Sequence, residues 1–215
     1  MEQEVSIPLM QNQESLQGIL MLPKNATKLV IFAHGSGSSR LSTRNQYVAK
    51  VLQQESIASL RVDLLTQEEE KIDAISLQYR FDLILLASRL LNVTSWALKN
   101  PSLKHLTIGY VGSSTGAAAA LMAAGSIPSS IYAIVCRGGR PDLVEGPLLT
   151  KVTAPTLLIV GELDIEVLEL NKRAFELLSG EKNLQIVPKA THLFEEEGAL
   201  ATVAKMTAHW FSSHA

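Results

Sequence analysis

The sequence holds a single cysteine, Cys136, among its 215 residues. One cysteine excludes a disulfide within the chain and any cysteine-rich metal site. No cluster of His, Cys or carboxylate residues has the spacing of metal ligands, so we expect neither a metal nor another cofactor. Because Cys136 ends an apolar run, we interpret it as a small buried hydrophobe and not as a nucleophile.

An excess of charge of one sign is also missing. The chain carries 19 Lys and Arg against 21 Asp and Glu, a formal net charge of −2. Without a basic stripe or an acidic tail, we expect no nucleic acid and no anionic membrane as partner. The most apolar region, 117–136, is interrupted by Gly125, Pro128 and several serines, and is too broken to span a bilayer. The first residues lack the basic region and apolar core of a signal peptide, so we expect a soluble, cytoplasmic protein of unknown oligomeric state.

Strands and helices alternate along the chain, whose 47% hydrophobic content suits one domain over residues 1–215. Apolar and β-branched runs predict eight strands, at 5–9, 16–22, 28–33, 57–64, 107–111, 131–135, 156–160 and 184–187. Helical spacing predicts helices at 45–54, 81–98, 165–178 and 199–211, with an alanine-rich helix after residue 114. The polar stretch 11–14 is typical of a hairpin turn, and the charged stretch 66–73 of a solvated loop.

This order predicts an α/β fold with a mostly parallel, twisted, eight-stranded sheet, antiparallel strands at the N-terminus and helices on both faces. In such sheets the ligand crevice lies beyond the carboxyl ends of the strands. Every cluster of residues that could take part in catalysis or binding falls at such a strand end, which predicts one shared site.

The segment Gly112-Ser-Ser-Thr-Gly116 lies between a β-branched run and an alanine run. This Gly-x-Ser-x-Gly pattern at a strand-to-helix turn predicts a strained backbone that exposes the Ser114 hydroxyl as a nucleophile. Glycines two residues before and after are needed because side chains there would collide with neighbouring elements. The alternative is that this segment is a Gly/Ser turn before a helix and has no catalytic role.

A serine hydroxyl needs an adjacent base, and the base needs a carboxylate. His192 follows the last strand at the correct edge, whereas the other four histidines lie at the wrong edge, in a helix, at the terminus or in the glycine-rich loop. Asp164, after the penultimate strand, is the candidate acid, with Glu162 and Asp142 as alternatives. Asp164 could instead cap the helix that begins near Ile165.

The glycine-rich loop His34-Gly-Ser-Gly37 follows a buried strand. It predicts an oxyanion hole made of the Ser36 N–H and the Thr115 N–H, while His34 serves loop structure. A phosphate-binding loop is the competing hypothesis, but the spacing matches neither Gly-x-Gly-x-x-Gly nor a Walker loop.

Four arginines follow the strand ends near this site, at Arg40, Arg44, Arg137 and Arg140. Guanidinium groups bind carboxylate or phosphate in a bidentate manner, which allows a substrate with an anionic group. The competing interpretation is that they pair with Asp or Glu side chains and order the loops.

Together the motifs His-Gly-Ser-Gly, Gly-Ser-Ser-Thr-Gly-Ala, Leu-Ile-Val-Gly-Glu-Leu-Asp and Ala-Thr-His-Leu-Phe, in this order, resemble the α/β-hydrolase superfamily. Nearly the whole chain is similar to its dienelactone hydrolase-like branch. Segments such as 42–45, 63–65 and 137–142 resemble a subgroup that is sometimes fused to a phosphoribosyltransferase domain. The resemblance implies Ser114 as nucleophile, Asp164 as acid, His192 as base, and N–H groups of Ser36 and Thr115 as oxyanion donors.

Two departures from the family pattern matter. Authentic dienelactone hydrolases carry cysteine at the elbow, whereas this chain has Ser114, which favours a general serine esterase. Only about twenty residues separate the strands at 131–135 and 156–160, where a lid is usually inserted, so we expect a minimal lid or none. We therefore expect hydrolysis of an ester or related acyl bond in a small-molecule substrate. The alternatives are a thioesterase or small peptidase with the same triad, and a catalytically silent binding domain.

Overall fold

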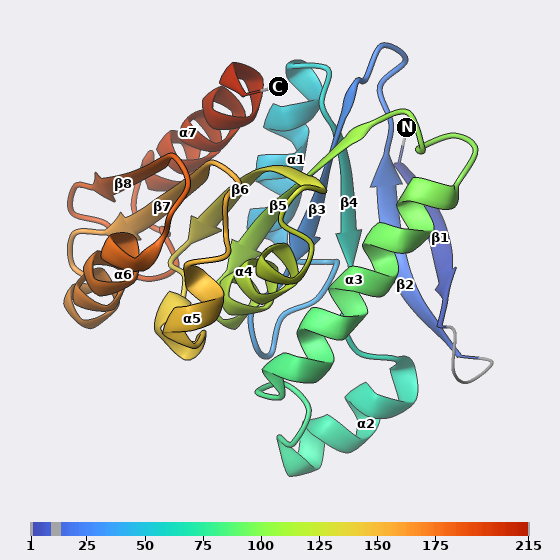
Figure 1. Ribbon diagram of the computed structural model, residues 1–215, viewed down its shortest axis with the longest axis horizontal. Helices are drawn as coiled ribbons and strands as arrows, with labels where there is room; N and C mark the ends of the chain where they lie inside the picture. The colour runs from blue at the N-terminus through green and yellow to red at the C-terminus, as the bar shows by residue number, and fades with distance from the viewer. Residues whose placement is uncertain (1, 10–13, 215) are drawn as a thin grey trace.

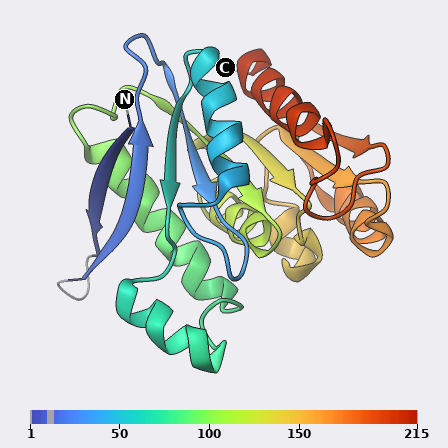
Figure 2. The ribbon, with the colours of Figure 1, turned by 180° about the vertical axis from the view of Figure 1, so that it is seen from behind.

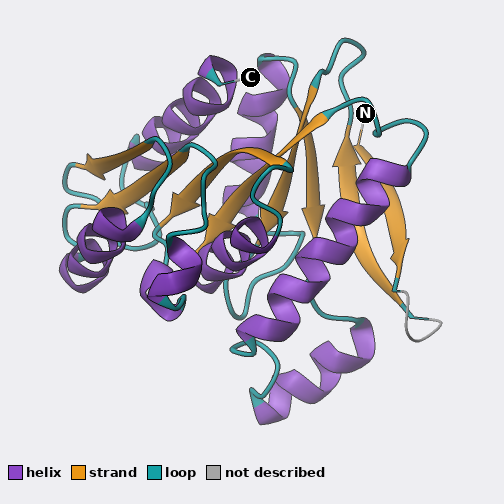
Figure 3. Cartoon of the chain, viewed as in Figure 1, coloured by secondary structure: helices purple, strands orange, loops and turns teal. Residues whose placement is uncertain are grey.

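The computed structural model describes residues 2–9 and 14–214. Eight strands form one sheet: β1 (Glu2–Pro8), β2 (Ser15–Met21), β3 (Lys28–Ala33), β4 (Ala58–Val62), β5 (Thr107–Ser113), β6 (Ile131–Arg137), β7 (Thr156–Gly161) and β8 (Lys182–Val187). The helices are α1 (Thr43–Gln54), α2 (Gln67–Ser76), α3 (Leu83–Lys99), α4 (Thr115–Ser126), η1 (Pro141–Leu143), α5 (Gly146–Leu149), α6 (Ile165–Leu177) and α7 (Ala199–Ser213). Figure 1 shows their arrangement and Figure 3 the same view by element type.

The sheet has the strand order β1-β2-β4-β3-β5-β6-β7-β8. β1 pairs with β2 and β2 with β4 in antiparallel register, and all later pairs are parallel. The predicted edge hairpin is confirmed, and the Leu9 N–H donates to the Glu14 carbonyl across its closed end (2.9 Å). The turn predicted at 11–14 lies mostly outside the described residues.

Helices cover both faces of the sheet, as the sequence predicts. Helices α3, α4, α5 and α6 lie on the face toward the viewer in Figure 1, and α1 and α7 lie together on the other face, which Figure 2 shows. Successive residues of β3 serve both cores: Leu29 and Ile31 pack toward α3 and α4, whereas Val30 and Phe32 pack toward α1 and α7. A strand buried on both faces explains the continuous apolar run in the sequence.

The expectation of a solvated loop at 66–73 is wrong, because most of this stretch belongs to α2. Thr66 caps the helix: its hydroxyl accepts from the Glu69 N–H (3.2 Å), and the Glu69 carboxylate accepts from the Thr66 N–H (2.8 Å). This capping box and the acidic residues in the first turn stabilise a helix in which Asp73 is the only buried residue. The charge run therefore marked a helix start and not a loop.

The remaining differences concern element ends and short elements. β5 continues through Gly112 to Ser113, and β8 begins at Lys182, earlier than predicted. The connection between β6 and β7 contains η1 and α5, both of which pack against α4. Among the described residues, none of the helices is long and apolar enough to cross a membrane.

Candidate active site

Ser114 occupies the turn between β5 and α4 with φ 50° and ψ −122°. A residue other than glycine adopts such a positive φ only when its surroundings enforce it. Here the enforcing contacts are the close packing at Gly112 before Ser114 and at Gly116 after it. A Cβ at Gly112 would lie 2.3 Å from Ala117 Cα, and one at Gly116 would lie 2.2 Å from the Ala33 carbonyl oxygen. Both positions therefore require glycine, and Ser114 lies in the predicted elbow geometry.

His192 and Asp164 are brought together from two different loops. Asp164 follows β7 and His192 follows β8, and the distance from His192 Nδ1 to Asp164 Oδ2 is 2.6 Å. Asp164 is the N-cap residue of α6 by position, but its side chain makes no capping hydrogen bond. Its carboxylate is directed to the histidine, where it can hold the proton on Nδ1 and leave Nε2 free as a base.

The exit of β6 connects His192 to the elbow. The Ser114 N–H donates to the Arg137 carbonyl (3.3 Å), and the Arg140 N–H donates to the Ser114 carbonyl (3.1 Å). A Cβ at Gly138, between those arginines, would lie 3.4 Å from Cε1 and Nδ1 of His192. The hydrogen bonds of the described residues include none between the Ser114 hydroxyl and His192, and such contacts are often loose before substrate binds.

The alternative acids and bases have other partners. Glu162 accepts from the Lys189 N–H (2.7 Å), and Asp142 forms two hydrogen bonds of 2.8 Å with Arg140. The Leu64 N–H donates to Nε2 of His34 (3.2 Å), so the ring proton lies on Nδ1, which contacts the Gly35 carbonyl (2.9 Å). His34 therefore fastens the glycine-rich loop to the end of β4.

The glycine-rich loop lies against the elbow, as the oxyanion prediction requires. A Cβ at Gly35 would lie 3.0 Å from Ser114 Cβ. The Ser36 N–H, however, donates to the hydroxyl oxygen of Thr115 (2.9 Å). One of the two predicted N–H donors is thus engaged by the side chain of the residue that supplies the other.

The four sequence-predicted arginines all have partners. Arg40 pairs with Asp63, Arg44 with Glu195 and Arg140 with Asp142. Each of these contacts orders a loop, which was the competing interpretation.

Arg137 differs from the other three because it is buried, with 7% of its surface exposed. It donates to Asn45 Oδ1 (2.9 Å) and to the Ser113 hydroxyl (2.8 Å). Burial, and then the neighbouring charge of Arg44, lowers the pKa of Arg137 to about 10, so it stays a cation at neutral pH. It supports the strand end beneath Ser114.

Cys136 is fully buried on β6, and burial raises the pKa of its thiol to about 12. A thiol with so high a pKa holds almost no nucleophilic thiolate at neutral pH. Ser114 is accordingly the nucleophile candidate at this sheet edge.

A cavity of about 320 Å³ lies beside the glycine-rich loop. Its walls come from the loop, the end of β4, α2 and the start of α3, and they include Ser36, Leu65, Glu70, Ala74, Arg80 and Leu86. A mixed lining of apolar and polar groups is typical of small-molecule sites.

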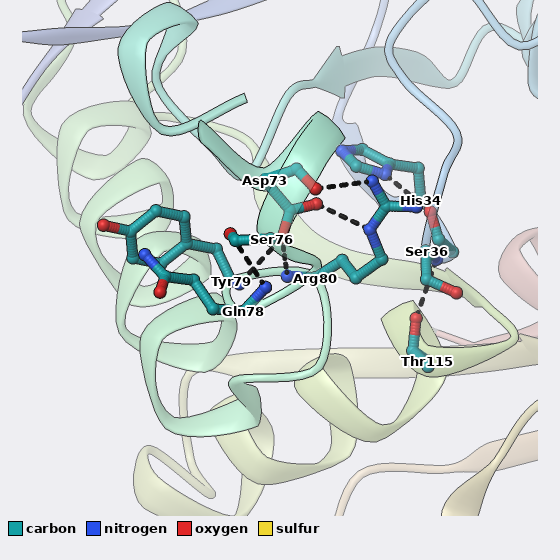
Figure 4. A network of polar contacts seen from close by, with 9 residues as sticks. His34, Ser36, Asp73, Ser76, Gln78, Tyr79, Arg80 and Thr115 are labelled. Atoms are coloured by element: carbon teal, nitrogen blue, oxygen red, sulfur yellow. Dashed lines mark hydrogen bonds and ion pairs between the residues drawn. The ribbon is translucent and has the colours of Figure 1, made fainter. Parts of the chain in front are cut away.

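Sequence reasoning missed the wall of this cavity that Asp73 and Arg80 build (Figure 4). Asp73 Oδ2 accepts from Arg80 Nε (2.6 Å), and Oδ1 accepts from the N–H groups of Tyr79 (2.7 Å) and Arg80 (3.0 Å). Burial of Asp73 opposes ionisation, but these donors hold the pKa of its carboxyl below its ordinary value. The Thr66-x-x-Glu69 pattern was the sequence signal that could have placed Asp73 on a helix.

The fold and the arrangement at its strand ends define the chain as an α/β-hydrolase. No protein-family model matches it. It is 52% identical to a dienelactone hydrolase from Anabaena variabilis, whose crystal structure superimposes with a TM-score of 0.96 over 99% of this chain and 97% of that one. The chain therefore belongs to the dienelactone hydrolase family and has the α/β-hydrolase fold.

Two further proteins are similar to this chain, one in its fold at low sequence identity and one in its sequence over part of a longer protein. Est1E from Butyrivibrio proteoclasticus shares the fold with a TM-score of 0.81, at 17% identity over 97% of both chains. A phosphoribosyl transferase-like protein of Mycobacterium tuberculosis is 52% identical over 197 residues, which are 92% of this chain but 43% of that protein. The chain thus spans less than half the length of that curated relative.

Proposed function

We propose that this protein is a serine hydrolase that cleaves an ester or related acyl bond through an acyl-enzyme. His192 Nε2 removes the proton of Ser114 as its oxygen attacks the substrate carbonyl. The oxyanion forms beside the Thr115 N–H and the Ser36–Thr115 contact. Protonated His192 then donates to the leaving group, and a water deprotonated by the same histidine releases the acid.

The observation that carries this proposal is the contact of Asp164 with His192 (2.6 Å) at the edge where Ser114 holds its positive φ. A carboxylate that caps its own helix would leave the histidine without a partner. The side chain of Asp164 makes no such cap, which supports the triad role. The strained serine backbone supports the same conclusion, because strain persists only where surrounding structure enforces it.

The substrate we propose is a small molecule, because the cavity at the loop holds about 320 Å³. The name of the longer mycobacterial relative adds no transferase activity to this proposal. The chain matches only 43% of that protein, whereas it covers 97% of the dienelactone hydrolase. A cytoplasmic location remains a prediction of the sequence.

Labelling with a fluorophosphonate, together with turnover of p-nitrophenyl acetate, tests the proposal. We expect the label on Ser114, and we expect Ser114→Ala to abolish both labelling and turnover. Ser126→Ala is the matched control, since Ser126 is an exposed serine at the end of α4, where its hydroxyl donates to the Met122 carbonyl (2.9 Å), and it lies outside both the cavity and the proposed triad. Turnover that survives in Ser114→Ala, with no label on Ser114 in the native protein, would refute the enzyme proposal. A panel of esters, lactones, thioesters and amides then identifies the bond.

A further inference from the structure

We propose that the hydroxyl of Thr115 is a catalytic donor to the oxyanion, polarised by the Ser36 N–H behind it. This inference rests on the serine hydrolase function proposed above. It replaces the Ser36 N–H as direct donor, so that both hydrogen bonds to the oxyanion come from Thr115, one from its N–H and one from its O–H.

The direction of the hydrogen bond carries the first step. The Ser36 nitrogen lies 2.9 Å from Thr115 Oγ1, and Figure 4 marks this contact with a dashed line. A backbone N–H can only donate, so Thr115 Oγ1 is the acceptor in this contact. The hydroxyl proton of Thr115 is therefore not consumed by Ser36 and can be donated elsewhere.

The position of Thr115 on its helix carries the second step. Thr94, Thr202 and Thr207 each donate their hydroxyl to the carbonyl four residues earlier, at 2.8–3.0 Å. Thr115 is the first residue of α4, so the residue four positions earlier, Val111, lies in β5 and offers no helical carbonyl. The usual intrahelical acceptor of a threonine hydroxyl is therefore missing at this position.

The surroundings keep this hydroxyl away from solvent and close to the elbow. Thr115 is only 5% exposed, and it lies in the seam between the glycine-rich loop and the elbow. Gly35 approaches Ser114 there, and Gly116 packs against the Ala33 and His34 carbonyl oxygens. A buried hydroxyl that accepts an N–H bond becomes a stronger donor, because chained hydrogen bonds polarise one another.

The proton of Thr115 stays on its oxygen throughout the reaction. When Ser114 Oγ bonds to the carbonyl carbon, the π electron pair moves to the carbonyl oxygen, which accepts from the Thr115 N–H and O–H. When the tetrahedral intermediate collapses, the carbonyl re-forms and both donors are released. The competing possibility is that the threonine side chain rotates away and frees the Ser36 N–H.

Three substitutions at Thr115 separate these possibilities. Thr115→Val removes the hydroxyl at nearly constant shape, Thr115→Ala removes it and leaves space, and Thr115→Ser keeps it. If the hydroxyl is a donor, Val and Ala lower kcat by about 10²- to 10³-fold, the loss typical for one oxyanion donor. KM for p-nitrophenyl acetate should change little, and Thr115→Ser should retain most of kcat.

A trifluoromethyl ketone inhibitor provides a second readout, since it forms the oxyanion without turnover. Its affinity should fall in parallel with kcat in Thr115→Val and Thr115→Ala, and melting temperatures should show that both variants are folded. Equal or higher kcat in Thr115→Ala and Thr115→Val would overturn the inference, because the freed Ser36 N–H would then be the donor. A loss in Thr115→Ser as large as in Thr115→Val would also overturn it. If Ser114→Ala is inactive, either of these results refutes only the role of Thr115 and the serine hydrolase proposal is kept. If Ser114→Ala is active, both proposals are refuted.

Discussion

The substitution Asp164→Asn separates catalysis from helix capping at one position. The Asp164 carboxylate contacts His192 Nδ1 at 2.6 Å, so it stabilises the tautomer whose Nε2 can accept the Ser114 proton. An asparagine amide can donate to Nδ1 instead, which places the ring proton on Nε2 and removes the base. Asparagine is as good an N-cap as aspartate, and the cap bond is not made here, so the free energy of unfolding should not fall.

The expected loss follows from the wrong tautomer. In a Ser-His-Asp triad this change costs about 10⁴-fold in kcat, which corresponds to about 5.4 kcal/mol at about 1.36 kcal/mol per decade. Steady-state hydrolysis of p-nitrophenyl acetate, with urea unfolding of the same samples, measures both effects. Glu162→Gln and Asp142→Asn are matched controls, because their carboxylates bind Lys189 N–H and Arg140, and they should keep near-normal kcat. A kcat for Asp164→Asn within about tenfold of wild type would refute the triad, since the barrier change would then be only about 1.4 kcal/mol.

Three further predictions concern the framework of the site. Gly116→Ala should destabilise the protein by more than about 3 kcal/mol in urea unfolding, because its Cβ would lie 2.2 Å from a carbonyl oxygen, whereas Gly146→Ala, with its nearest contact at 3.7 Å, should stay within about 0.5 kcal/mol. The depressed pKa of Asp73 stabilises the fold above its ordinary value of 3.8, and this contribution is lost as pH falls through the lower folded pKa; Asp73→Asn should therefore be less stable at neutral pH and lose less stability on acidification, and an unchanged acid limb would contradict this. Iodoacetamide should alkylate Cys136 only in denaturant, and mass spectrometry showing modification of the native protein would contradict its burial.

Local patterns predicted the fold wherever a segment is buried on both faces or follows one helical period. The run at 28–33 has one structural solution, a central strand, because both of its faces are apolar. The stretch 66–76 has no such signal: charged residues and the isoleucines Ile72 and Ile75 are exposed together on α2, and only Asp73 among its residues is buried. A polar helix depends on its caps and on tertiary contacts, and the contact of Asp73 with Arg80 could not be read from the sequence.

For the site, the sequence indicated which loops meet but not how their polar groups divide the hydrogen bonds. Parallel strands bring their carboxyl ends to one edge, so Ser114, Asp164 and His192 could be placed there from chain order. The engagement of the Ser36 N–H by the Thr115 hydroxyl depends on a side-chain rotamer, for which the motif holds no signal. The arginines illustrate the same limit, since their charge was evident but their carboxylate partners depend on loop geometry.

The wall of the cavity is formed by the segment between β4 and α3. A lid of the usual kind would instead be inserted after β6. Residues 138–155 form only η1 and α5, which pack on α4, and the His192 side chain remains 38% exposed. On the opposite side of the glycine-rich loop, α2 and Arg80 enclose the cavity, and Asp73 fixes Arg80 in that wall. None of the proposed triad residues lies in this wall. Two regions of the chain therefore meet here: the strand ends hold the proposed triad, and the segment between β4 and α3 encloses the cavity beside the glycine-rich loop. Substitutions in α2 can therefore change the shape of this cavity without moving Ser114, Asp164 or His192.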